Sequence, residues 1–147
     1  MLLSELSVNN GQATKKSEGG TIRFAYQGLP ITIENDKGSI RRWKNDAGET
    51  GKVTMFYRYG FIEGTVGADN EEIDCFIGYN PYASNVYIIN QMKENGEEFD
   101  EEKIFLGFSS EENARDAFLA HVNNQKMLGE IITMPMYLFK ETLEFRK

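Results

Sequence analysis

Short stretches of alternating apolar and polar residues run through the chain from Thr21 onward, and clusters of Gly, Asn and Asp separate them. Alternation with a period of two residues is typical of a strand that buries one face. Many such short strands within one domain predict a closed or nearly closed antiparallel barrel. The expected strands fall within residues 22–26, 31–33, 40–43, 53–57, 73–77, 86–89 and 103–108.

The clearest strand and turn signals lie in the second half of the chain. Residues 86–89, Val-Tyr-Ile-Ile, are apolar throughout, so this strand is expected to be buried on both faces. Asn95-Gly96, within the charged segment 93–98, is a strong hairpin signal. Residues 103–108 are therefore expected to form the return strand of that hairpin.

Helical periodicity is found only near the C-terminus. Ser109 and Glu112 have the spacing of a capping box, and apolar residues recur at helical spacing from Ala114 onward. A second helix is expected to begin at Thr133, with Pro135 in its first turn. The predicted fold class is mainly β (α+β), a small antiparallel β-barrel with two C-terminal helices.

The chain of 147 residues has the length of one ordinary domain. Residues 1–20 are polar and lack apolar periodicity, so we expect a flexible N-terminal arm followed by a single domain over residues 21–147. No apolar run approaches the roughly 20 residues of a membrane helix, and the start of the sequence does not resemble a secretory signal. We therefore expect no membrane partner.

The formal net charge of -7 limits the partners that the protein can have. An acidic surface repels phosphate backbones and disfavours nucleic acid. It suits the binding of hard cations or the blocking of a basic partner, and it also favours plain solubility. The single cysteine, Cys75, fits a reducing cytoplasm and an inert core thiol. The single histidine, His121, argues against a zinc site or a catalytic triad and is expected to be structural.

Three carboxylates on one short segment are the best candidates for chemistry. Asp69 and Glu71 are two residues apart, so on an extended chain they would point the same way. Asp74 begins an apolar strand, where a carboxylate is costly unless it is paired or bound to metal. Oxygen ligands suit Mg²⁺ or Mn²⁺. A solvated acidic turn is the alternative interpretation.

The stretch from residue 59 to residue 77, YGFIEGTVGADNEEIDCFI, resembles soluble family I inorganic pyrophosphatases. Residues 69–75 are similar to the acidic signature of that family, with Glu71 in place of the expected aspartate. The resemblance is greater still to a compact pyrophosphatase-like domain of bacteriophage and mobile-element proteins, and it includes residues 96–108. In all, it covers about residues 22–140.

The resemblance implies a small barrel of the oligonucleotide-binding type and Mg²⁺-dependent hydrolysis of pyrophosphate or a related small phosphate compound. It also implies a set of site residues. The metal ligands would be Asp69, Glu71 and Asp74, with Glu101 (or Asp100, in the other register) as a further ligand. Tyr59 would lie beside the metal ions as a catalytic residue. The residues that contact the substrate would be Glu34, Arg41, Lys103 and Lys140.

Some positions depart from the pattern of the enzymes. Trp43 stands where a glutamate is expected, Phe139 lacks the hydroxyl of a Tyr-Lys pair, and Asn90 stands where aspartate is common. These departures leave a second hypothesis open, a catalytically weak or inactive phage protein that binds and inhibits a host protein through its acidic surface. The first hypothesis implies a small phosphate-containing substrate in the cytoplasm of a bacterium or phage-infected cell. The sequence leaves a homo-oligomer open.

Overall fold

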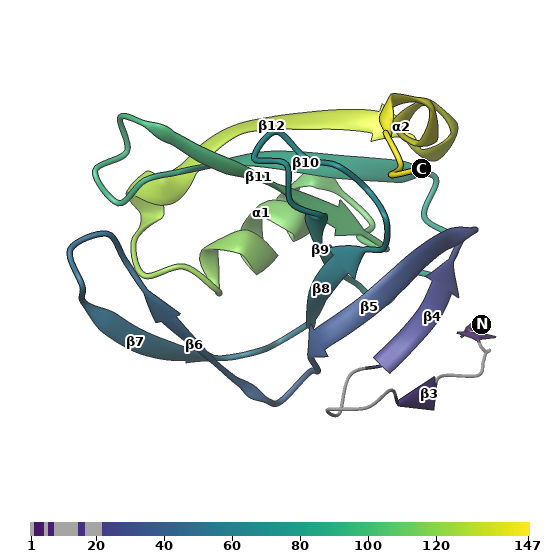
Figure 1. Ribbon diagram of the computed structural model, residues 1–147, viewed down its shortest axis with the longest axis horizontal. Coiled ribbons are helices and arrows are strands. Elements are labelled where there is room, and N and C mark those ends of the chain that lie inside the picture. The colour runs from purple at the N-terminus through teal and green to yellow at the C-terminus, as the bar shows by residue number, and fades with distance from the viewer. Residues whose placement is uncertain (1, 5, 8–14, 17–21) are drawn as a thin grey trace.

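The computed structural model describes the backbone of residues 2–4, 6–7 and 15–16 and the whole of residues 22–147, and a curved sheet dominates it (Figure 1). The sheet has eight strands, and every neighbouring pair is antiparallel apart from β9 with β11. The predicted fold class, mainly β with antiparallel pairing, is confirmed. In order across the sheet, the strands are β12 (Leu128–Pro135), β10 (Asn85–Met92), β11 (Phe99–Leu106), β9 (Ile73–Ile77), β8 (Arg58–Ile62), β5 (Leu29–Asn35), β4 (Ile22–Tyr26) and β3 (Lys15–Lys16).

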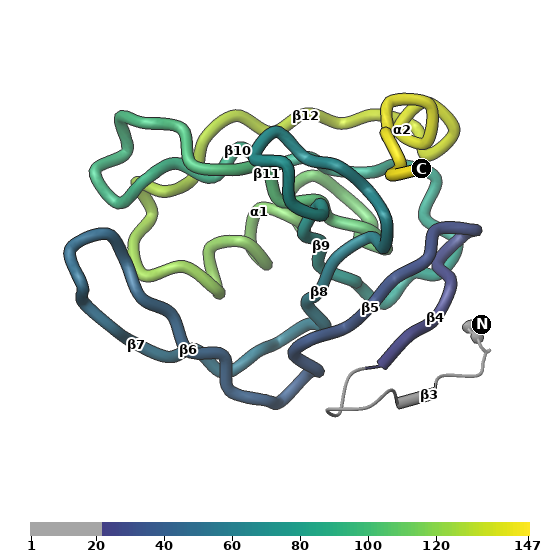
Figure 2. Tube along the Cα trace, viewed as in Figure 1, coloured from purple at the N-terminus to yellow at the C-terminus, as the bar shows by residue number. Residues whose placement is uncertain are grey.

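A separate antiparallel hairpin is formed by β6 (Ile40–Lys44) and β7 (Thr50–Thr54). Burial alternates along it, so that Arg41 and Trp43 are partly buried whereas Arg42 is exposed. Figure 2 shows the tip of this hairpin at the same end of the molecule as the connection between β10 and β11. The two hairpins thus frame one end of the fold.

The hairpin expected around Asn95-Gly96 is confirmed. The N–H of Lys93 donates to the carbonyl of Glu98 at 2.7 Å, and Gly96 has a φ of 76°, which glycine adopts without strain. The strand before the turn, β10, lies between β11 and β12 in the sheet. Its residues 86–89 are buried, as predicted.

Two helices lie near the C-terminus, α1 (Glu111–Leu119) and α2 (Met136–Thr142), and a short 3₁₀ turn, Gln125–Met127, separates α1 from β12. The predicted start of the second helix at Thr133 is wrong, because Thr133 belongs to β12 and pairs with Tyr87 of β10. Ser110, and not Ser109, caps α1, and its hydroxyl accepts from the N–H of Asn113 at 3.0 Å.

The two faces of the sheet carry separate hydrophobic cores. One core, which includes Ile31, Cys75 and Phe139, packs against α2. The other, which includes Phe76 and Phe105, packs against α1. Cys75 is fully buried, which confirms its expected place in the core, and its burial raises the pKa of the thiol.

The N-terminal segment contributes short strands at the edge of the fold. The strand β1 (Leu2–Ser4) pairs in parallel with β2 (Leu6–Ser7), and β3 pairs with β4. The remainder of the arm expected over residues 1–20 lies outside the described residues. Among the residues that the structure describes, no helix combines the length and apolarity needed to cross a membrane.

Candidate active site

A buried lysine lies at the centre of the candidate site, on the face of the sheet that packs against α1. Lys103 is 7% exposed, and its ammonium donates to the Tyr59 hydroxyl at 2.5 Å. It also donates to Oδ2 of Asp74 at 3.0 Å and to Oε1 of Glu101 at 3.1 Å. The Tyr59 hydroxyl in turn donates to Asp74 at 2.8 Å. We call Lys103, Tyr59, Asp74 and Glu101 the Lys103 cluster.

Strand register brings the Lys103 cluster together. Glu101 and Lys103 are two residues apart on β11, so both side chains lie on the same face of the sheet. The parallel pairing of Ile104 with Cys75 places the residues that precede them, Lys103 and Asp74, side by side. Tyr59 reaches the same face from the neighbouring strand β8.

Gly60, which follows Tyr59, allows β5 and β8 to approach closely. A Cβ atom at this position would lie 1.8 Å from the carbonyl oxygen of Thr32 and 2.8 Å from Cα of Ile33. The pairing of β5 with β8 is irregular between Ile33 and Asn35, where Glu34 lies. Gly60 is therefore required for packing, because only a residue without a side chain lets the strand that carries Tyr59 lie against the strand that carries Glu34.

The charges of the Lys103 cluster are mutually stabilised. Burial lowers the pKa of the Lys103 ammonium, but its contacts with Tyr59, Asp74 and Glu101 outweigh burial and raise it. Burial raises the pKa of Asp74, but the charge of Lys103 and the hydrogen bonds to this carboxylate lower it overall. Burial raises the pKa of the Tyr59 phenol. At neutral pH the site thus holds a fixed cation, a carboxylate and a protonated phenol.

Two further carboxyl groups bind protons more tightly than usual. The pKa of Glu101 is raised to about 7 by burial and by its hydrogen bond with Asp74. The pKa of Glu34 is raised by burial and by the charge of Asp74, although Arg41 opposes this shift. Glu101 therefore changes its protonation near neutral pH and can hold or release a proton beside Lys103.

Asp69 and Glu71 lie in a turn just before β9. Oδ1 of Asp69 accepts from the N–H of Glu71 at 3.0 Å, and Asn70 between them has a φ of 66°. The extended chain on which they were expected to point the same way is therefore not found. Both side chains are exposed, and Arg146 steadies the turn through a 2.5 Å hydrogen bond to the Asn70 carbonyl.

The carboxylates predicted to bind metal do not form one compact group. Within the part of the chain that the structure describes, no three His, Cys, Asp or Glu side chains are grouped closely enough to hold a metal ion. Asp74 and Glu101 lie together at Lys103 and offer carboxylate oxygens of the kind that a hard cation prefers, whereas Asp69 and Glu71 are exposed in the turn before β9. Burial first, and then the neighbouring Asp74, raise the pKa of Glu101 although Lys103 opposes them, so a further cation there would favour the charged form of Glu101.

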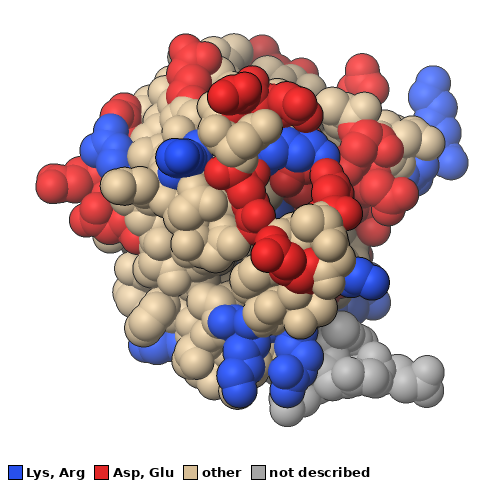
Figure 3. Space-filling view, turned by 90° about the vertical axis from the view of Figure 1, so that its left-hand side faces the viewer, with Lys and Arg blue, Asp and Glu red and all other residues tan. Residues whose placement is uncertain are grey.

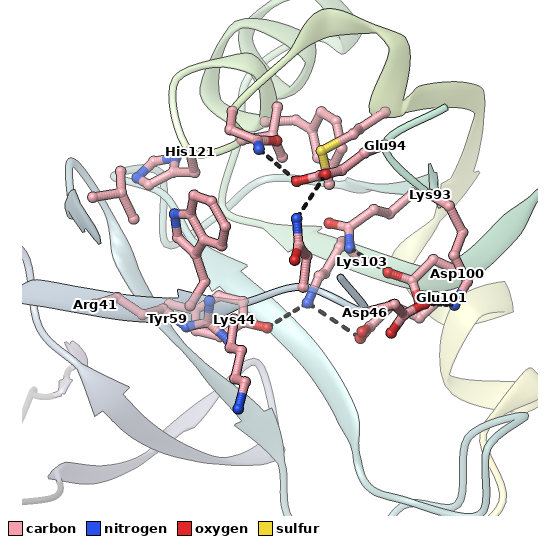
Figure 4. A pocket seen from close by; sticks show the side chains of 18 of the residues that line it. Arg41, Lys44, Asp46, Tyr59, Lys93, Glu94, Asp100, Glu101, Lys103 and His121 are labelled. Atoms are coloured by element: carbon pink, nitrogen blue, oxygen red, sulfur yellow. Dashed lines mark hydrogen bonds and ion pairs between the residues drawn. The ribbon is translucent and has the colours of Figure 1, made fainter. Parts of the chain in front are cut away.

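An open cavity of about 680 Å³ lies beside the Lys103 cluster (Figure 4). Tyr59 and Lys103 line it together with the hairpin β6–β7, the β10–β11 connection and the end of α1. Arg41 enters from β6, with its guanidinium 4.7 Å from the centroid of the Tyr59 ring. The ammonium of Lys103 lies 4.9 Å from the same centroid. The cavity therefore presents two cations next to one tyrosine.

Polar contacts across the mouth of the cavity hold its two walls together. Lys93 of the β10–β11 connection forms a 2.8 Å ion pair with Asp46 of the β6–β7 turn. Nδ2 of Asn45 donates to Glu94 at 2.9 Å, and Nδ2 of Asn123 donates to the same carboxylate at 2.5 Å. Figure 3 views this end of the molecule and shows acidic side chains gathered over its middle, with Lys and Arg along its lower edge and also among the acidic groups of its upper half.

His121 links the end of α1 to the connection between β7 and β8. Its Nε2 accepts from the N–H of Phe56 at 3.0 Å, and its Nδ1 lies 2.6 Å from the carbonyl oxygen of Ala117. These two contacts require a neutral ring with the proton on Nδ1. Burial lowers the pKa of His121 in the same direction. The histidine is a structural residue, as expected from the sequence.

The structure does not bring Lys140 to the Lys103 cluster. Its ammonium lies 3.3 Å from the position that a Cβ of Gly28 would occupy. Gly28 precedes β5 and Glu34 lies near the end of that strand, about 20 Å away at the usual rise of a strand. Phe139 is 2% exposed and belongs to the core, and Asn90 lies on β10 opposite Glu102.

Two features of the cavity were missed in the sequence, the aromatic wall formed by Trp43 and the ion pair between Lys93 and Asp46. The position of Trp43 could have been predicted from the alternation along β6, because Arg41 and Trp43 share one face of the strand. No local pattern predicts the second, because its partners are 47 residues apart in the sequence.

The family model described as Inorganic Pyrophosphatase matches residues 12–144, which is nearly the whole chain. The chain therefore belongs to the inorganic pyrophosphatase family. No curated protein and no solved structure matches it. The matched range contains every residue of the Lys103 cluster and Arg41.

Proposed function

We propose that this protein is a Mg²⁺-dependent phosphoanhydride hydrolase that acts on pyrophosphate or a related small phosphate compound. The Lys103 cluster carries the proposal, because a buried cation, a carboxylate and a carboxyl group that titrates near neutral pH lie side by side. Membership of the inorganic pyrophosphatase family supports the same reaction class.

The cationic side chains would bind the phosphate groups of the substrate. Arg41 lies over Tyr59, and its planar guanidinium can donate to two phosphate oxygens at once. The three N–H groups of Lys103 are donated to Tyr59, Asp74 and Glu101, so its charge is held in position, and it would bind a phosphate oxygen in exchange for one of these partners. The single proton of the Tyr59 hydroxyl is already donated to Asp74, so Tyr59 would act by holding this carboxylate and Lys103 in place.

The carboxylates Asp69, Glu71, Asp74 and Glu101 would hold magnesium. Bound Mg²⁺ supplies charge neutralisation of the phosphates and lowers the pKa of a coordinated water. A carboxylate of this set that is not bound to metal would accept the proton of the attacking water. Glu34 lies close enough to Asp74 and Lys103 for their charges to shift its own pKa, so it borders the same site.

A second candidate function is the binding and inhibition of a basic host protein by a pyrophosphatase-like phage protein that lacks turnover. Two observations favour it, the net charge of -7 and the acidic side chains over the middle of the face in Figure 3. Such a function would need the acidic surface but not the cations of the cavity.

Phosphate release from pyrophosphate, measured with and without Mg²⁺, tests the proposal. We expect release only with Mg²⁺ and a loss of about 10²–10³ in rate for Asp69→Asn. Asp116→Asn is the matched control, because Asp116 is exposed on α1 away from the cavity, and it should keep the wild-type rate. If no phosphoanhydride is hydrolysed, the hydrolase proposal is wrong, and the binding of a basic host protein becomes the favoured function.

A further inference from the structure

We propose that the cavity binds a nucleoside polyphosphate, with its phosphates at Arg41 and Lys103 and its base against Trp43. This inference rests on the proposed function and names the substrate class of the same site. The reaction would be hydrolysis of a phosphoanhydride: water adds to one phosphorus, the P–O–P bond breaks, and the two products share the protons of the water. It needs no oxidant or reductant.

The cavity is larger than a site for pyrophosphate requires, and part of its mainly polar wall is apolar. Its volume of about 680 Å³ lies within the range, roughly 300–1,000 Å³, of sites for organic ligands. Beyond Arg41 and Lys103, its lining includes Met55, Phe118 and Met127. Pyrophosphate has no apolar group that could contact such a wall, whereas a nucleoside has one.

Trp43 provides a flat surface in this wall. It pairs with Gly51 across the hairpin, and a Cβ on Gly51 would lie 2.2 Å from Cζ2 of the indole. One side of the ring therefore rests directly on the Gly51 backbone, and only glycine leaves room for it. The ring is partly exposed and lines the cavity. A supported, partly exposed indole suits stacking with a base.

The spacing of the two ligand-binding groups also fits a nucleotide. Arg41 and Trp43 are two residues apart on β6 and share the face that lines the cavity, which separates their Cα atoms by about 7 Å. Arg41 lies at the end of the cavity that Tyr59 and Lys103 line, where the two cations would attract phosphate. Trp43 lies one pleat nearer the tip of the hairpin. One face of β6 thus carries a phosphate-binding group, Arg41, followed by an aromatic surface, Trp43.

Isothermal titration calorimetry in the presence of Mg²⁺ tests this inference with ADP, GDP, UDP and pyrophosphate as probes. We expect at least one nucleotide to bind about tenfold more tightly than pyrophosphate. Trp43→Ala should weaken that nucleotide about tenfold and leave pyrophosphate unchanged, whereas Trp43→Phe should keep most of the affinity. Tyr82→Ala is the matched control, because Tyr82 is 87% exposed and does not line the cavity.

The intrinsic fluorescence of the protein gives an independent signal, because Trp43 is its single tryptophan. A bound nucleotide should quench this emission, and pyrophosphate should not. If pyrophosphate binds and no nucleotide binds more tightly, or if Trp43→Ala weakens both ligands equally, the inference is wrong and the proposed function stands. If neither pyrophosphate nor any nucleotide binds, the proposed function fails together with the inference.

Discussion

The ammonium of Lys103 lies 3.0 Å from the carboxylate of Asp74, and the strands that carry them, β11 and β9, form the parallel pair of the sheet. The side chain of Lys103 is 8% exposed and that of Asp74 is 28% exposed. A buried cation of this kind is costly unless its partners remain in place. The pair therefore couples the stability of the sheet to the chemistry of the site.

Replacing Lys103 by methionine should destabilise the protein. The change leaves Asp74 and Glu101 without their shared cation, which costs about 1–3 kcal/mol once the partial exposure of both carboxylates is allowed for. Urea unfolding at pH 8 measures the change in the free energy of unfolding. Lys52→Met is the control, because Lys52 is exposed on the outer face of β7, and it should change stability by less than about 0.5 kcal/mol. Equal stability of both variants would contradict the structural role of Lys103.

Magnesium should raise the melting temperature of the protein, and Asp74→Asn should remove this response. Burial and the neighbouring Asp74 disfavour the negative charge of Glu101, and a cation bound to the folded protein would favour that charge. A thermal shift assay with millimolar Mg²⁺ measures the effect, with Asp116→Asn as the control that should respond like the wild type. If Asp74→Asn responds as fully as the wild type, Asp74 is not a metal ligand. If the variant unfolds without metal, Asp74 is chiefly a structural hydrogen-bond acceptor.

Gly60→Ala should destabilise the fold by about 3 kcal/mol or more, because its Cβ would overlap the Thr32 carbonyl, which is backbone and cannot rotate away. Gly67→Ala is the milder comparison, since its nearest atom would lie 3.1 Å away. Chemical denaturation of both variants measures the difference. A Gly60→Ala protein as stable as Gly67→Ala would show that β5 and β8 are less closely packed than described.

Acidification should weaken the contact between α1 and the β7–β8 connection. The pKa of His121 in the folded protein is below its ordinary value of 6.5, so the unfolded chain binds the proton more readily. The contribution of His121 to stability is therefore fully present above pH 6.5 and decreases as the pH falls toward the folded-state pKa. Urea unfolding between pH 7.5 and pH 5 should show a smaller loss for His121→Gln than for the wild type. Identical pH profiles would mean that the ring does not need to be neutral.

The strands and the acidic end of the site were predictable because their signals are local. Asp74 at the start of an apolar strand marks β9, and Asn95-Gly96 marks the hairpin that carries Lys103. The neighbours of Lys103 were not predictable from pattern, because the pairing of β11 with β9 joins segments that are distant in sequence. Only the family resemblance pointed to Lys103.

The start of α2 shows where local patterns fail. Residues 131–134 are largely apolar, which suits a helix or a strand, and pairing with β10 decides for the strand up to Pro135. Lys140 shows the same limit for the site. Its position after Phe139 fits the family pattern, but the helix places its ammonium beside Gly28. Tertiary packing, and not the motif, determines which cations face the cavity.

The rate of Mg²⁺-dependent phosphate release from pyrophosphate by Lys103→Met, beside that of Lys52→Met, tests the central claim most directly. The account predicts release by the wild type, a loss of about 10²–10³ in rate for Lys103→Met, and an unchanged rate for Lys52→Met. Circular dichroism establishes beforehand that both variants are folded at the assay temperature. A folded Lys103→Met protein with the wild-type rate, or a wild type without Mg²⁺-dependent release, would contradict the assignment of the Lys103 cluster as the active site.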